Sequence, residues 1–165
     1  EHLLPVGPLR EPISRLETVD WVVTNERVSD RVPQNQTLIQ VVPICFVSLG
    51  TGEKLSVKTF VERFSAVTAL AGIGNPGRFY RTLTDLGLEV EMREFPDHHR
   101  YIASDLDFGS GVPLVITEKD EIKISQLDKI SKNIWTLIIE LKVGLEGDRI
   151  LMNFLQGKGF KIGKS

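Results

Sequence analysis

Three residues able to transfer protons or bind a metal stand side by side at Asp97-His98-His99. They follow a segment that is expected to be a strand, where sites in α/β proteins usually lie. A carboxylate beside imidazoles suits acid–base chemistry or metal binding. Adjacent side chains in an extended segment point to opposite faces, so the two histidines are not expected to share one metal. Taken alone, the segment favours a simpler interpretation, an exposed helix start with Asp97 as its N-cap.

A glycine-rich segment from Gly72 to Gly77 has the spacing G-x-G-x-x-G. A strand is expected before it and a helix after it, and Glu94 follows at about the 20-residue separation of the dinucleotide-binding pattern. In that interpretation the helix N-terminus binds a pyrophosphate and Glu94 binds a ribose. The alternative is a tight strand-to-helix turn that needs glycine for its backbone. The spacing alone favours neither, although the chain has no room for the substrate domain of a dehydrogenase.

Three shorter motifs carry weaker signals. Arg10-Glu11 lies between prolines, where Arg can bind phosphate and Glu can bind Mg²⁺, although a surface ion pair is the simpler interpretation. Thr117 to Asp120 follows an expected strand and suits a helix cap. Gly163-Lys164-Ser165 is similar to the end of a P-loop, but Lys158 stands where that pattern has glycine and no helix is expected after it.

The composition limits the class of protein. Of the 165 residues, 41% are hydrophobic and 25% are charged, so a folded core is expected and a disordered chain is not. The formal net charge of −2 provides no basic surface for nucleic acid. The longest apolar run, Ile39 to Val47, contains Pro43 and is far shorter than the roughly 20 residues of a membrane span. The single cysteine, Cys45, allows no intramolecular disulfide, and its apolar surroundings predict a buried thiol.

The elements that must position these residues alternate between strand and helix from residue 57 onward. The expected strands are 67–71, 88–95, 112–116 and 135–141, and the expected helices are 57–64, 76–86, 99–106 and 148–156. Alternation of this kind indicates βαβ units and a parallel sheet. Before residue 57 we expect a short helix at 13–20, a strand at 21–24 and two ribbon strands at 37–42 and 44–49.

The predicted fold class is therefore α/β, arranged in successive segments. Residues 1–36 are expected to be the end of a preceding α/β domain, and residues 37–56 a β-ribbon linker. Residues 57–156 are expected to form a small parallel-sheet domain, and 157–165 a tail. Because the chain opens with Glu1 in a Pro-rich loop, we expect it to be part of a longer protein.

Four of these motifs occur together and in a fixed order. They are GPLREP at 7–12, AGIGNPGRFY at 71–80, FPDHHRY at 95–101 and VITEKD at 115–120. In this combination the chain, from about Leu3 to Leu141, resembles the C-terminal half of the tetraacyldisaccharide 4′-kinases, the lipid A kinases of Gram-negative bacteria. The resemblance implies two α/β domains joined by a β-ribbon, with residues 1–36 as the remnant of a P-loop kinase domain. It also makes the 72–77 segment a packing turn.

The resemblance implies an activity and roles for three residues. The family transfers the γ-phosphate of ATP to the 4′-hydroxyl of tetraacyldisaccharide 1-phosphate. His98 aligns with a histidine that pairs with the base carboxylate of the other domain, and Glu11 with a glutamate of the Mg²⁺–phosphate network. Arg10 would supply countercharge to phosphate. The P-loop and the base lie in the N-terminal half, so ATP and Mg²⁺ are expected to bind mainly there and this chain alone is expected to be inactive.

The resemblance also implies partners and a location. They are a lipid disaccharide substrate, peripheral contact with the cytoplasmic face of the inner membrane, and a P-loop domain in cis or in trans. The basic tail with Lys158, Lys161 and Lys164 either touches an anionic membrane or is simply solvated. The alternative function is a dinucleotide-binding or stand-alone ligand-binding α/β module that uses the 72–77 loop. The presence of a P-loop domain discriminates between the two functions.

Overall fold

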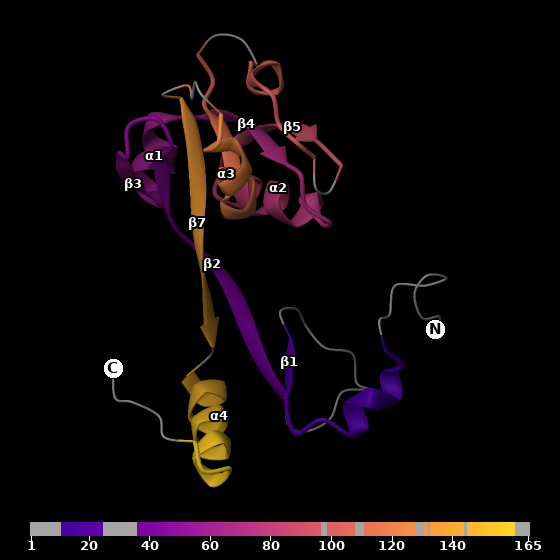
Figure 1. Ribbon diagram of the computed structural model, residues 1–165. Coiled ribbons are helices and arrows are strands. Elements are labelled where there is room, and N and C mark those ends of the chain that lie inside the picture. Colours follow the sequence, from indigo (N-terminus) through magenta and orange to yellow (C-terminus); the bar gives the residue numbers. More distant parts are fainter. Residues whose placement is uncertain are drawn as a thin grey trace. The chain divides into compact units, whose positions relative to one another are not determined.

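The computed structural model describes residues 11–24, 36–96, 99–107, 111–127, 131, 133–143 and 145–160. The chain divides into two compact units (Figure 1). The larger unit is Pro43–Glu140, and the smaller one combines Glu1–Val42 with Leu141–Ser165. The two are described separately below.

A mostly parallel sheet forms the centre of the larger unit, with the strand order β2-β7-β6-β4-β5. Its parallel pairs are β4 with β5, β4 with β6, and β6 with β7. The short strand β3 pairs antiparallel with β2. The bounds are β2 (Gln36–Ser48), β3 (Lys54–Ser56), β4 (Ala66–Ala71), β5 (Glu89–Glu94), β6 (Leu114–Thr117) and β7 (Ile134–Val143). This arrangement confirms the predicted α/β class and its parallel sheet.

Each helix of this unit begins at a local signal. The Ser56 side chain accepts a hydrogen bond from the Thr59 backbone N–H and caps α1 (Val57–Arg63). Pro76 occupies the first turn of α2 (Pro76–Asp85), and Gly87, with φ of +91°, lies just beyond its end. Thr117 caps α3 (Glu118–Ile124). The predicted helices at 57–64 and 76–86 and the predicted cap at Thr117 are confirmed.

Two predicted elements are corrected. The two ribbon strands expected at 37–42 and 44–49 are a single strand, β2. Pro43, which stands between the two expected strands, lies inside β2; β1 (Val22–Thr24) pairs with β2 only at 36–38, and β3 pairs with it only at 45–47. The proline therefore lies where neither short strand needs its missing N–H. The helix expected at 99–106 is only the 3₁₀ turn η2 (Ala103–Leu106), because Ile102 is extended.

Apolar side chains on the two faces of the sheet form two clusters. Val67, Ala69 and Ala71 of β4 belong to one cluster, whereas Leu70 belongs to the other. This is the alternation expected of a strand that is buried on both faces. On the first face the rings of Phe46 and Phe60 stack with their centroids 3.7 Å apart. Cys45 is buried, as predicted.

The smaller unit contains η1 (Ile13–Glu17), β1, the start of β2 and α4 (Leu145–Gly157). The Trp21 ring lies 5.0 Å from that of Phe154, and its Nε1–H donates to Thr37 Oγ1. Lys158 Nζ pairs with Asp20 Oδ1 at 2.8 Å. The predicted tail lies outside the described residues from 161 onward. Within the described part of the chain, no helix is long and apolar enough to cross a bilayer.

Candidate functional site

Two of the three predicted site residues, Arg10 and His98, lie outside the described residues, as does Asp97. The third, Glu11, is exposed, and its Oε2 lies 3.1 Å from Arg15 Nε. Glu11 is therefore in a surface ion pair, although its partner is Arg15. A lone exposed carboxylate paired with arginine does not make a Mg²⁺ site. The described residues contain no group of three potential metal ligands.

The segments on both sides of Asp97-His98 are described, and both are tied down. Before the pair, the Phe95 N–H donates to the Ala71 carbonyl at 3.2 Å, which continues the β4–β5 pairing. After it, the His99 N–H donates to the Pro96 carbonyl at 3.0 Å. The rings of Phe95, His99 and Tyr101 lie within 4.6–5.4 Å of one another. The chain on either side of the predicted catalytic histidine is therefore held at the carboxyl end of β5.

A buried carboxylate, Asp120, joins the ends of three neighbouring strands. It is fully buried in the first turn of α3, directly after β6. Its oxygens accept hydrogen bonds from Tyr101 Oη at 2.8 Å, from Thr117 Oγ1 at 2.7 Å and from the Gly72 N–H at 3.3 Å. Gly72 follows β4, Tyr101 follows β5 and Thr117 ends β6. Asp120 thus fixes the carboxyl edge of the sheet, where α/β proteins bind their ligands.

The first glycine of the G-x-G-x-x-G segment has a clear structural purpose in this network. A Cβ atom at Gly72 would lie 2.4 Å from Tyr101 Oη and 3.1 Å from Asp120 Oδ1. Only glycine leaves room for both oxygens. At Gly74, by contrast, a Cβ would have no neighbour within 4 Å. The Gly72 N–H already donates to a carboxylate, so it is not free for a pyrophosphate.

Burial and hydrogen bonding perturb three titratable groups around this edge. Burial, followed by the hydrogen bond to Asp120, raises the pKa of the Tyr101 phenol far above its usual value. Burial also raises the pKa of Tyr80, whose hydroxyl donates to the Arg93 carbonyl, to about 12. The pKa of Asp105 is lowered, first by the hydrogen bond with His99 and then by the Ile102 N–H. The two tyrosines therefore stay protonated at neutral pH.

The sequence interpretation missed Asp120 and Tyr101 as members of one network. Thr117-x-x-Asp120 was interpreted as a helix cap, and Thr117 does accept from the Asp120 N–H at 3.2 Å. No sequence signal pairs Tyr101 with Asp120, because 19 residues separate them. Their two motifs, FPDHHRY and VITEKD, were the available hint. Asp120 therefore has a structural role, because its carboxylate oxygens accept hydrogen bonds from donors of the chain itself.

The fold is that of an α/β protein with a mostly parallel sheet. Its candidate site lies at the carboxyl edge of that sheet. A model of the tetraacyldisaccharide-1-P 4′-kinase family matches residues 1–157. Named tetraacyldisaccharide 4′-kinases include those of Dechloromonas aromatica, 38% identical over 94% of this chain, and Pseudomonas aeruginosa, 42% identical over 73% of it. The chain belongs to this family.

The comparisons also show how much of the family's length the chain spans. It covers 46% of the Dechloromonas relative and 35% of the Pseudomonas relative, which is less than half of each. A crystal structure of LpxK from Aquifex aeolicus in complex with ATP matches 92% of this chain and 48% of that one, with a TM-score of 0.60 and 24% identity. At that identity the likeness is one of fold.

Proposed function

We propose that this chain supplies the C-terminal part of a lipid kinase that transfers the ATP γ-phosphate to the 4′-hydroxyl of tetraacyldisaccharide 1-phosphate. The observation that carries the proposal is the family match over residues 1–157. We assign residues 1–36 to the end of the P-loop domain, 37–56 to the β-ribbon linker and 57–156 to the C-terminal domain. ATP and Mg²⁺ then bind mainly to the N-terminal half, and the protein works peripherally at the inner membrane.

In this proposal His98 hydrogen-bonds the carboxylate that accepts the proton of the 4′-hydroxyl. Such a pair orients the carboxylate and tunes its pKa. Phosphoryl transfer depends mainly on positioning and charge neutralisation, so a residue contributed by the second domain matters. The ties at Phe95 and His99, and the Asp120–Tyr101 bond beyond them, support this role because they hold the backbone flanking His98. Arg10 supplies countercharge to the phosphates, and Glu11 takes part in the Mg²⁺–phosphate network.

The proposal is tested on the intact protein that contains this chain. With tetraacyldisaccharide 1-phosphate and ATP as substrates, His98→Ala is expected to lower kcat about a hundred-fold or more, the usual contribution of acid–base groups. The KM for ATP is expected to stay unchanged, because ATP binds to the other half. Glu62→Gln serves as the control, since the described chain places Glu62 in an exposed pair with Lys58. An unchanged kcat in His98→Ala would refute the role of His98, and an inactive wild-type protein would refute the kinase itself.

The alternative of a dinucleotide-binding module finds less support in the geometry. Gly72, the first glycine of the G-x-G-x-x-G segment, donates its N–H to the Asp120 carboxylate. A buried carboxylate at that position repels a pyrophosphate. Glu94, the expected ribose ligand, is an exposed residue at the end of β5.

A further inference from the structure

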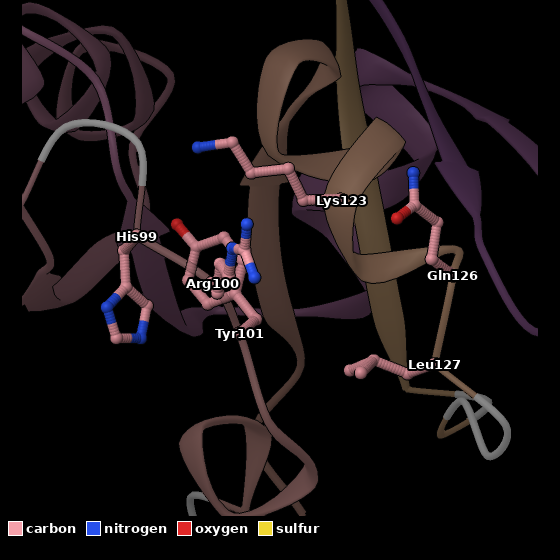
Figure 2. A pocket seen from close by; sticks show the side chains of 6 residues that line it. All are labelled: His99, Arg100, Tyr101, Lys123, Gln126 and Leu127. Atoms are coloured by element: carbon pink, nitrogen blue, oxygen red, sulfur yellow. The ribbon is translucent and has the colours of Figure 1, made fainter.

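A concave site lies in the larger unit and includes His99, the residue that follows the proposed catalytic His98 in the chain (Figure 2). Its volume is about 500 Å³, which lies within the range of small-molecule sites. Three segments contribute to it: the stretch after β5, the end of α3 and the turn that follows α3. The lining residues are His99, Arg100, Tyr101, Lys123, Gln126 and Leu127.

The lining is positively charged, and its cations lack counterions. Arg100 is exposed, Lys123 is half-buried, and none of the described residues that line the pocket is a carboxylate. Lys123 Nζ is covered and makes no hydrogen bond within the described chain; its near neighbour is the Tyr101 ring, with the centroid 5.8 Å away. The nearby carboxylates are already engaged, Asp105 with His99 at 2.9 Å and Asp120 with its three donors. Among the described residues, the two cations of the pocket therefore have no carboxylate partner.

An unpaired, covered ammonium is costly, because its lost hydration is not replaced. A cation–π contact with the Tyr101 ring replaces only part of that hydration. An anion in the pocket would neutralise Lys123 and Arg100 together. The arginine offers a planar fork of donors, the lysine a point charge and Gln126 an amide donor, which together suit the several oxygens of a phosphate.

We infer that this pocket binds a phosphate monoester group, carried either by a small soluble molecule or by a lipid headgroup. Arg100 contacts the phosphate at the exposed side, Gln126 donates to it, and Lys123 supplies the second charge from beside the Tyr101 ring. Leu127 and the Tyr101 ring provide apolar contact for the group that bears the phosphate. The inference does not require the proposed kinase function, although the 1-phosphate of the proposed lipid substrate belongs to the same chemical class.

The test titrates the 165-residue chain with two probes while recording amide and side-chain NMR signals. One probe is inorganic phosphate, and the other is phosphatidylcholine vesicles with and without phosphatidic acid. Saturable shifts at Arg100 and Gln126 are expected. Loss of one charged donor costs about 1.5–3 kcal/mol, so Arg100→Gln and Lys123→Met are each expected to weaken binding by about ten-fold or more.

Lys58→Ala is the matched control, because it removes the same charge from a side chain on α1 that is 85% exposed. Arg100→Gln keeps the test valid if Lys123→Met fails to fold, since Arg100 is exposed. Saturation by inorganic phosphate that is sensitive to these variants identifies a soluble ligand, and sensitivity seen only with phosphatidic acid identifies a lipid headgroup. Either result supports the site. Absence of saturation with both probes, or equal weakening in Lys58→Ala, overturns it, whatever the outcome of the kinase assay.

Discussion

Asp120 shows how one residue can order a whole edge of the sheet. A buried carboxylate is stable only when hydrogen-bond donors replace its lost water. Here the donors come from Gly72, Tyr101 and Thr117, which belong to the ends of three different strands. Removing one partner leaves a buried polar group unsatisfied, at a cost of about 1–3 kcal/mol. The stability of this edge therefore depends on a few particular residues.

The first prediction compares two glycines of the same loop. Gly72→Ala is expected to destabilise the fold by about 1–3 kcal/mol, because its new methyl group overlaps Tyr101 Oη and crowds Asp120 Oδ1. Gly74→Ala adds the same methyl group in open space and is expected to change stability by less than about 0.5 kcal/mol. Urea unfolding measures both. Equal effects of the two substitutions would contradict the packing described at Gly72.

The second prediction concerns the two tyrosines of the chain, Tyr80 and Tyr101. Both have a raised pKa, so above the ordinary value of 10.0 the unfolded chain loses protons that the folded chain keeps. Their stabilising contribution is complete below pH 10.0 and declines as the pH rises toward the folded values, the lower of which is about 12. Tyrosinate absorbance should rise near pH 10.0 in urea but only at higher pH in buffer. Ionisation of either phenol near pH 10.0 in the folded protein would contradict its burial.

At the residue scale, the sequence identified candidate site residues but not the hydrogen-bond partners that they find in the fold. Asp97-His98 and Arg10-Glu11 were recognisable because reactive residues stood together. Asp120 was recognisable only as a capping residue, because a cap depends on neighbours three positions away. Its bonds to Gly72 and Tyr101 depend on which strands become neighbours, and local spacing does not encode that.

At the scale of elements, the strands and helices follow directly from hydrophobic period and caps. Strands β4 and β6 are apolar apart from one threonine each, because both of their faces are buried. The exception is β2, which is one continuous strand although two strands were expected on either side of Pro43. Whether a proline ends a strand depends on which neighbour faces its nitrogen, and only the assembled sheet decides that.

The third prediction tests the core that holds α1 on the sheet. Phe60 is fully buried, stacks on Phe46 at 3.7 Å and meets the Trp135 ring edge-on at 5.4 Å. Phe60→Ala is expected to destabilise the protein by about 3–5 kcal/mol through lost burial and a cavity. Ile122→Ala is the control, since Ile122 is 67% exposed on α3 and is expected to change stability by about 0.5 kcal/mol or less. A loss below about 1 kcal/mol for Phe60→Ala in thermal or urea unfolding would contradict this packing.

At the scale of the whole molecule, the sequence predicted a family from four ordered motifs, and the match over residues 1–157 confirms it. Individual motifs were ambiguous because each has a local structural explanation, as Gly72 shows. The smaller unit leaves Ile13, Val23, Leu38, Ile150 and Phe160 exposed. The larger unit also leaves large apolar side chains exposed, among them Met92 and Ile102, so this exposure does not distinguish the two units.

The last prediction separates the two functions proposed for the 72–77 loop. If that loop is a packing turn, the chain is expected to show no saturable binding of NAD, because the Gly72 N–H and the space above it belong to Asp120 and Tyr101. A dinucleotide site would instead saturate, and Glu94→Gln would weaken it by removing the ribose acceptor. Calorimetric titration of the chain with NAD measures this, and Glu91→Gln is the control on the same strand. Saturation that depends on Glu94 but not on Glu91 would favour a dinucleotide-binding module over a part of a lipid kinase. Absence of saturable NAD binding would support the packing role of Gly72 in this loop.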